Sequence, residues 1–412
     1  MFFRKVAVVV VLLQGFTAAH IVPHLRFAAV MGFLVGPLGL ALGCASVPGE
    51  YQNERITADE VLAGTPFDLE NNLTELIEED AVIAVSPEMK TFLDTNVDLK
   101  AGDIIKLRQL ANAIINDNTF GLEYDDITRT ASETFRAKRG NCLSFTNMFV
   151  VMARYLSLDV YFQEVDIPPD WTSDGGVSVL NRHINVFVDL GLTRDQVVDF
   201  NMDDFRSTYD MNTISNSRAM AHFNNNMGVE RMLAGDTASA FRYFRRALID
   251  NDRGFSPAWT NLATLYLREG FTALAEAGYL HALKADRLDH VAMSNLAGIY
   301  VRQGDSKRAA EYRKKVNYHR KRNPYYRYEL ARRAFYAKDY DVAIEHLMYA
   351  IRKRPSEDQF GFLLGLSSLR KGDRKSTRYW LGRAEEVAAQ DALKQKYSNK
   401  IEKLQSELNQ LD

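Results

Sequence analysis

Residues 135–165 read FRAKRGNCLSFTNMFVVMARYLSLDVYFQEV and contain one of the two cysteines of this 412-residue chain. Asn141 is a residue type that caps helices, so we expect a helix to begin at Cys142. Apolar residues then recur at spacings of three and four along one helical face, Phe145, Met148, Phe149, Met152 and Leu156. A run rich in β-branched and aromatic residues at 160–162 predicts a strand after this helix.

The position of Cys142 has two interpretations. In the first turn of a helix, unpaired backbone N–H groups and the helix dipole favour negative charge, which favours a thiolate nucleophile. The alternative is an inert core cysteine, because cysteine packs like a small hydrophobe. The sequence around the cysteine leaves both open.

A thiolate catalyst needs a base, and the base needs a group that orients it. His183 begins a strand-like run at 183–188, and Asp199 ends the next run. Adjacent antiparallel strands would bring the two side by side. Asp189 and Asp195 are rivals in poorer positions, because they flank the turn between those strands. Taken alone, His183 would be read as an ordinary hydrogen-bonded histidine.

The segment Arg139-Gly140-Asn141-Cys142, the apolar helix after it and a strand at 158–165 resemble the transglutaminase-like superfamily. The resemblance covers about residues 100–210. It implies an α+β papain-like domain in which a cysteine opens a core helix, and a histidine and an aspartate follow on strands. On this basis the catalytic residues are Cys142, His183 and Asp199, and the chemistry is acyl transfer from an amide carbonyl to water or an amine.

The chain departs from this family pattern at one aromatic residue. No tryptophan stands in the positions directly after His183, whereas Trp171 precedes it on a loop that contains Pro168 and Pro169. There it would either shape a substrate cleft or cover the core. The natural oxyanion donor is the backbone N–H of Cys142, and Gln163 is a second candidate. Hydrolysis, deamidation and cross-linking share the first half of the reaction, so the sequence does not separate them.

The first 43 residues are typical of a targeting region. An apolar run at 6–19 follows Arg4 and Lys5, and a second apolar run ends in Ala-Leu-Gly-Cys at 41–44. This ending resembles a bacterial lipobox, which implies lipid attachment to Cys44; an uncleaved membrane anchor is the alternative. We expect a lipid-anchored protein of the bacterial cell envelope that faces the periplasm, with the outer membrane as its membrane. Cys142 would then lack a disulfide partner.

From about residue 220 the sequence repeats. Small residues recur 34 positions apart at Ala263, Ala297, Ala331 and Gly365. This period resembles tetratricopeptide repeats, whose helix signatures match Trp259, Leu262, Ala263 and Tyr266, and then Ala275, Tyr279 and Ala282. Small residues let neighbouring helices cross closely. We therefore predict an all-α solenoid at 215–405, with about five units and a capping helix, after a linker at 44–70 and the α+β domain at 71–210.

Charge and motifs restrict the partners. The net charge of −2 excludes a general attraction to nucleic acid. The chain from residue 215 onward is basic, and the part before it is acidic. The basic stretch at 313–333 predicts a solvated helix face, with anionic lipid or the acidic domain as alternative partners. We find no phosphate-binding loop and no cluster with metal-ligand spacing, so we predict no cofactor and no metal site.

Three functions remain open at this stage. The leading hypothesis is a thiol acyl-transfer enzyme, most simply a peptidase or amidase, whose repeats bind a polypeptide substrate or partner. The second is a catalytically inactive scaffold that assembles an envelope complex through its repeats. The third is a peptide-binding chaperone. The repeats by themselves also allow a spacer or a dimerisation array, and the oligomeric state stays open.

Overall fold

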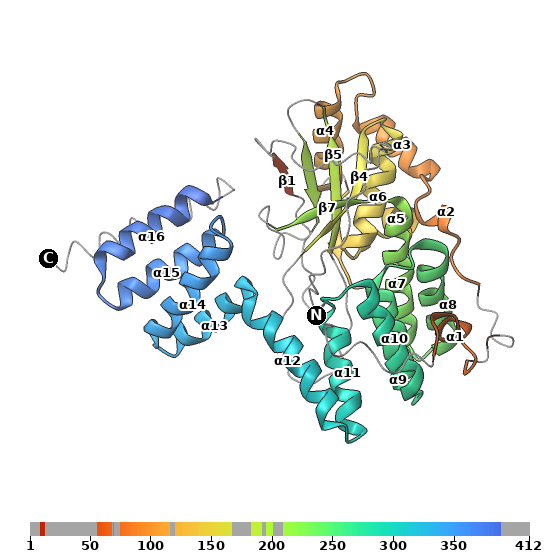
Figure 1. Cartoon of the computed structure of the whole chain (residues 1–412). Helices are drawn as coiled ribbons and strands as arrows, with labels where there is room; N and C mark the ends of the chain where they lie inside the picture. Colours follow the sequence, from red (N-terminus) through yellow and green to blue (C-terminus); the bar gives the residue numbers. More distant parts are fainter. Residues whose placement is uncertain are drawn as a thin grey trace, which may run out of the picture.

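The computed structural model describes residues 56–67, 69, 75–115, 120–166, 183–191, 195–200 and 209–388, together with the backbone of residues 9–12. A sheet with helices on it occupies one part of the molecule, and a series of helix pairs occupies the other (Figure 1). Within these residues, no helix is long and apolar enough to cross a membrane.

Six helices lie between β1 and β4 in the sequence: α1 Ala58–Ala63, α2 Glu79–Val82, α3 Pro87–Asn96, α4 Asp103–Ile115, α5 Ala131–Ala137 and α6 Cys142–Tyr155. Of these, α1 packs in the core of the repeats through Val61 and Leu62. Their starts follow local capping rules. Thr57 and Thr130 each form a capping box, with Glu60 and Glu133 respectively, which satisfies two backbone donors at each helix start. Helix α6 contributes most of its side chains to the core, as its apolar face predicts.

The main sheet has the strand order β1-β6-β5-β4-β7, and every neighbouring pair is antiparallel. Its strands are β1 Val9–Leu12, β4 Asp159–Val165, β5 His183–Asp189, β6 Gln196–Asp199 and β7 Met211–Ile214. A short parallel ladder, β2 Glu123–Tyr124 with β3 Arg139–Gly140, lies directly before α6. Four residues of the first apolar run thus form the edge strand β1 beside β6.

The second part is a row of antiparallel helix pairs within residues 216–387, so the predicted helical repeat array is present. The pairs are α7 Asn216–Leu233 with α8 Thr237–Arg246 and the π-helical turn η1 Ala247–Asn251, α9 Ser256–Arg268 with α10 Thr272–Ala285, α11 His290–Arg302 with α12 Ser306–Arg322, α13 Pro324–Tyr336 with α14 Tyr340–Lys353, and α15 Asp358–Arg370 with α16 Arg374–Val387. The predicted capping helix would follow α16 and lies outside the described residues.

The small residues of the repeat occur where helices approach closely. A Cβ atom built on Gly278 would lie 2.8 Å from the Cβ of Ala263, and one built on Gly365 would lie 2.7 Å from the side chain of Leu381. Real Cβ atoms do not approach this closely, so a larger residue would push the paired helices apart. This is the physical basis of the 34-residue pattern.

Helix α7 belongs to both parts of the molecule. Its residues Ala219, Met220 and Phe223 pack in the core of the sheet and α6, whereas Ala221 and Val229 pack in the core of the repeats. The predicted domain boundary at 210–215 therefore falls just before a helix, α7, that packs in the cores of both parts. No flexible joint is expected at this place, because apolar burial on both faces holds α7 in position.

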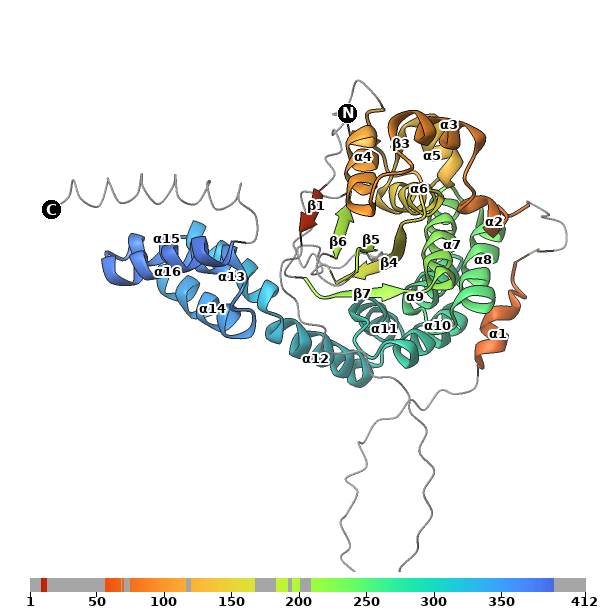
Figure 2. The same cartoon turned by 90° about the horizontal axis from the view of Figure 1, so that it is seen from above.

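The repeat array has a separate hydrophobic core after α12. The core of the first three helix pairs ends at Tyr312, and α13–α16 have a core of their own around Leu347 and Phe360. Figure 2 shows α13–α16 set apart from the earlier helices, with α12 leading to them. An ion pair between Arg354 and Asp210 and a ring contact between Tyr325 and Tyr209 link this last section to the segment that enters β7.

Candidate functional site

The structure brings Cys142, His183 and Asp199 into one constellation. Nε2 of His183 lies 2.7 Å from Oδ2 of Asp199, and the Asp199 side chain is fully buried. Burial opposes a charge on His183, but hydrogen bonds to Asp199 and Cys142, together with the charges of both, outweigh it and raise the pKa of His183 to about 10. His183 is thus a buried, protonated histidine between the carboxylate of Asp199 and the thiol of Cys142.

The rival aspartates have other contacts. Oδ1 of Asp189 accepts a hydrogen bond from the backbone N–H of Gly191 at 2.8 Å and so closes the turn after β5. Asp195 stands just before β6, where its carbonyl accepts a hydrogen bond from the side chain of Gln196. Asp199 is therefore the carboxylate that contacts His183.

Cys142 is the first residue of α6, and Asn141 is its N-cap. Oδ1 of Asn141 accepts hydrogen bonds from the backbone N–H of Ser144 at 2.9 Å and from its hydroxyl at 3.0 Å. Gly140 is required by packing, because a Cβ atom there would lie 2.7 Å from the Cβ of Ser144. The half-buried thiol of Cys142 is thus held at the positive end of a firmly capped helix.

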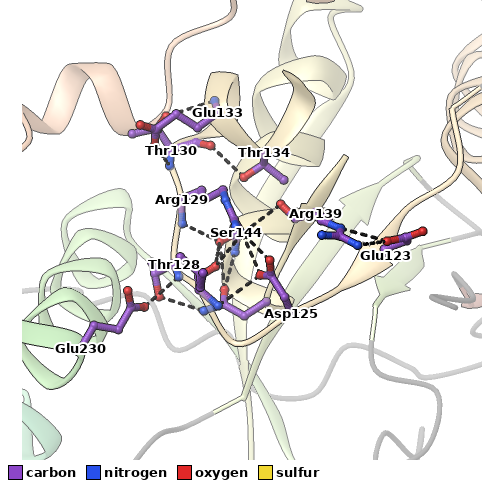
Figure 3. A network of polar contacts seen from close by, with 12 residues as sticks. Glu123, Asp125, Thr128, Arg129, Thr130, Glu133, Thr134, Arg139, Ser144 and Glu230 are labelled. Carbon is purple, nitrogen blue, oxygen red and sulfur yellow. Dashed lines mark hydrogen bonds and ion pairs between the residues drawn. The ribbon is translucent and has the colours of Figure 1, made fainter. Parts of the chain in front are cut away.

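A polar network surrounds this helix start (Figure 3). The backbone N–H of Arg129 donates to the hydroxyl of Ser144 at 2.9 Å, and its guanidinium forms two hydrogen bonds, 2.7 and 2.8 Å long, with the carboxylate of Asp125. Arg139 binds Glu123 on the neighbouring strand at 2.9 Å. These contacts join the loop after β2 to the start of α6. Sequence reasoning missed them, since no local pattern marks the loop.

Tyr124 is a second residue that sequence reasoning missed. It forms the end of β2, where it pairs with Gly140. Burial, followed by the charge of Cys142, raises its pKa, so the phenol stays neutral near the thiol. Its hydroxyl also has a hydrogen bond with Asp126, in the loop after β2.

Asn185 is a third residue that was missed. Its Nδ2 donates to Oδ2 of Asp199 at 2.9 Å, which is the same oxygen that contacts His183, and Asn185 is fully buried. A signal existed in the sequence: residues two apart on a strand share a face, so Asn185 follows His183 on β5. The amide fixes the rotation of the carboxylate that orients the histidine.

Replacing Asn185 with leucine is expected to slow alkylation of Cys142 about tenfold at neutral pH. A hydrogen bond to a charged group contributes about 1.5–3 kcal/mol, and its loss leaves the buried carboxylate of Asp199 with one donor fewer. The rate is measured by peptide mass spectrometry after timed iodoacetamide treatment. Asn261→Leu is the matched control, since Asn261 is also a buried asparagine and its Nδ2 donates to Asn225 within the repeat array. Equal rates in the two variants would contradict the role of Asn185.

Other predicted residues lie elsewhere. Gln163 is in the sheet, between Asn185 on β5 and Thr213 on β7, and its Oε1 has no hydrogen-bond partner among the described residues. Trp171 and Cys44 lie outside the described residues, so the role of the first and the lipidation of the second stay predictions. Among the residues that the structure describes, no group of histidine, cysteine or acidic side chains could hold a metal ion.

No protein-family model and no curated protein matches the chain. Solved structures are similar to part of it: the MamA protein (18% identity, 41% of this chain and 91% of that one, TM-score 0.23), YrrB, described as a tetratricopeptide-repeat protein with an unusual peptide-binding site (15%, 44% and 92%, 0.23), and pilF of Pseudomonas aeruginosa (16%, 47% and 88%, 0.25). Scores this low carry no argument, so the description of the array rests on its own helix pairs.

Proposed function

We propose that the chain is a cysteine-dependent acyl-transfer enzyme with a transglutaminase-like, papain-like domain, and that its simplest reaction is hydrolysis of an amide. The observation that carries the proposal is the hydrogen-bonded Cys142–His183–Asp199 constellation at the start of α6. A buried histidine that keeps its proton between a carboxylate and a thiol is costly unless the charge has a use.

The reaction follows from these positions. The thiolate of Cys142 attacks the amide carbonyl, and the carbonyl electrons move onto oxygen. The backbone N–H of Cys142 is free of an intrahelical acceptor, because it lies in the first turn, and it can donate to that oxygen. The imidazolium of His183 transfers its proton to the departing amine as the C–N bond breaks. Neutral His183 then takes a proton from water, which attacks the thioester and releases the acid and the thiolate.

The repeat array would supply the substrate or partner contact. Arrays of helix pairs present extended surfaces that bind polypeptides, so we assign this role to α7–α16. Lipid attachment at Cys44 and a place in the bacterial envelope remain part of the proposal, supported by the second apolar run, which ends in Ala-Leu-Gly-Cys at 41–44. Cleavage before Cys44 would remove β1, which is an edge strand of the sheet. An inactive scaffold is the alternative, and it does not require a reactive thiol.

Acylation with p-nitrophenyl acetate tests the enzyme directly. The full chain is expected to release p-nitrophenolate and to acquire an acetyl group on the peptide that contains Cys142, at least about tenfold faster than free cysteine at about pH 6.5, because the thiolate is preformed. Cys142→Ser should lose the acetylated peptide while its circular dichroism spectrum is unchanged. Acetylation no faster than that of free cysteine would favour the scaffold.

A further inference from the structure

The first helix of the repeat array contacts the loop that supports the nucleophile. Oε1 of Glu230, in α7, accepts a hydrogen bond from the backbone N–H of Thr128 at 2.7 Å, across 102 positions of sequence (Figure 3). We propose that Glu230 is a positioning residue for Cys142 and acts on it through Thr128 and Asn141. This inference rests on the proposed acyl-transfer function.

The connection consists of three hydrogen bonds in series. Glu230 holds the backbone of Thr128, and the hydroxyl of Thr128 accepts a hydrogen bond from Nδ2 of Asn141 at 2.8 Å. Oδ1 of Asn141 in turn accepts from the N–H of Ser144 at 2.9 Å, which is the capping bond of α6. Asn141 thus uses both ends of its amide, so movement of Thr128 would turn the cap away from the helix.

The loop around Thr128 depends on such contacts. It runs between β2 and α5 and has no ladder or helix of its own, so its backbone needs outside partners to hold one conformation. Glu230 supplies one of them from a separate part of the chain. Because Cys142 is the residue directly after the cap, a loosened first turn would weaken the alignment of its thiol with the helix dipole.

The placement of Glu230 is itself unfavourable for a carboxylate. Burial raises its pKa, against the effects of the Thr128 hydrogen bonds and of the nearby charges of Arg231 on α7 and Arg129 on the loop. A neutral side chain would fill this position at lower cost in desolvation. The need for a strong hydrogen-bond acceptor opposite the Thr128 N–H explains why a glutamate occupies position 230. In this way the repeat array contributes a residue to the domain that contains Cys142.

The test uses the full chain and the alkylation rate of Cys142 by iodoacetamide at about pH 6, read by peptide mass spectrometry so that Cys44 is counted separately. Glu230→Leu removes the acceptor and is expected to slow the reaction about five- to tenfold, the effect of losing one hydrogen bond to a charged group. Glu230→Gln keeps a carbonyl acceptor and should restore the rate to within about twofold of the unaltered chain.

Glu276→Leu is the matched control. Glu276 is a buried acid of the same array that accepts a hydrogen bond from Tyr300 at 2.8 Å, far from the Thr128 loop in sequence. Its loss should lower the melting temperature and leave the alkylation rate unchanged. If circular dichroism shows that Glu230→Leu does not fold, Glu230→Asp replaces it. Aspartate is one methylene shorter, so its carboxylate lies farther from the Thr128 N–H, and the alkylation rate of Cys142 should again fall.

The outcomes separate the two proposals. A reactive unaltered chain with an equally reactive Glu230→Leu variant would overturn the positioning role and leave the proposed function standing. A Glu230→Gln variant as slow as the leucine variant would also overturn it, because the acceptor would then not be the cause. An unaltered chain that reacts like free cysteine would remove the proposed function, and this inference with it.

Discussion

Replacing His183 with alanine is expected to slow alkylation of Cys142 by roughly 30- to 100-fold at about pH 6. A free cysteine has a pKa of about 8.5, so less than about 1% of it is thiolate at this pH. In the unaltered chain, the imidazolium of His183 lies beside Cys142 and stabilises negative charge on the attacking sulfur. Its removal returns the thiol to the behaviour of a free cysteine, and the gain in intrinsic nucleophilicity offsets only part of the loss.

The pH dependence follows from the raised pKa of His183. A group whose pKa rises on folding contributes stability that is complete below its unfolded value near 6.5 and is lost as the pH rises through about 10. The imidazolium is therefore present from acid to about pH 9, so the alkylation rate of the unaltered chain should exceed that of His183→Ala most at about pH 6 and converge with it toward pH 9. In His183→Ala the rate should increase about tenfold per unit up to about pH 8.5.

The experiment has a control within the same chain. His346, on α14, is a histidine of the repeat array, so His346→Ala should leave the profile of Cys142 unchanged. Asp199→Asn should resemble His183→Ala, because the buried carboxylate no longer holds the imidazolium. An unaltered chain whose rate increases with pH like that of free cysteine would show that the three residues do not act together.

Replacing Arg218 with methionine is expected to lower the free energy of unfolding by about 2–3 kcal/mol, because it removes hydrogen bonds to two carboxylates in a partly buried cluster. Arg218 lies between the sheet and the array: its Nε contacts Glu164 on β4 and its Nη1 contacts Asp252 after η1, both at 2.7 Å. Nε2 of His222 contacts the same oxygen of Glu164 at 2.7 Å. The methionine would leave Glu164 with His222 as its partner and would remove the ion pair of Asp252.

The same cluster predicts sensitivity to acid. Burial opposes the charge on Glu164, but hydrogen bonds and charges from His222 and Arg218 outweigh it and lower its pKa to about 2. A carboxyl group with a lowered folded pKa contributes stability that is present above its unfolded value near 4.5 and is lost as the pH falls through about 2. The contribution is about 3 kcal/mol, and Arg218→Met should remove most of it.

Urea unfolding at about pH 7 and pH 3 measures both effects. The matched control is Arg253→Met, because Arg253 pairs with Asp59 at 2.6 Å while both side chains are largely exposed. Surface pairs of this kind contribute less than about 1 kcal/mol, so this variant should resemble the unaltered chain. If Arg218→Met were as stable as Arg253→Met, the ion pairs of Arg218 with Glu164 and Asp252 would not stabilise the packing of the sheet on the array.

Much of the fold was predictable because its signals are local. The 34-residue spacing of small residues reflects close helix crossings, and Asn141 followed by apolar residues at spacings of three and four reflects one capped helix. The proximity of His183 and Asp199 was also predictable, since each lies at the end of a short strand and the two strands follow one another. In these cases, the pattern lies within consecutive repeat units, one helix or two successive strands.

The sequence by itself determined the repeat array, the helix that begins at Cys142 and the order of the three candidate catalytic residues. Only the tertiary structure decided that α7 lies in two cores and that Glu230 reaches Thr128. The reason is physical: helix periodicity and capping are short-range properties of the backbone, whereas a contact across 102 positions exists only after two separate parts have packed together.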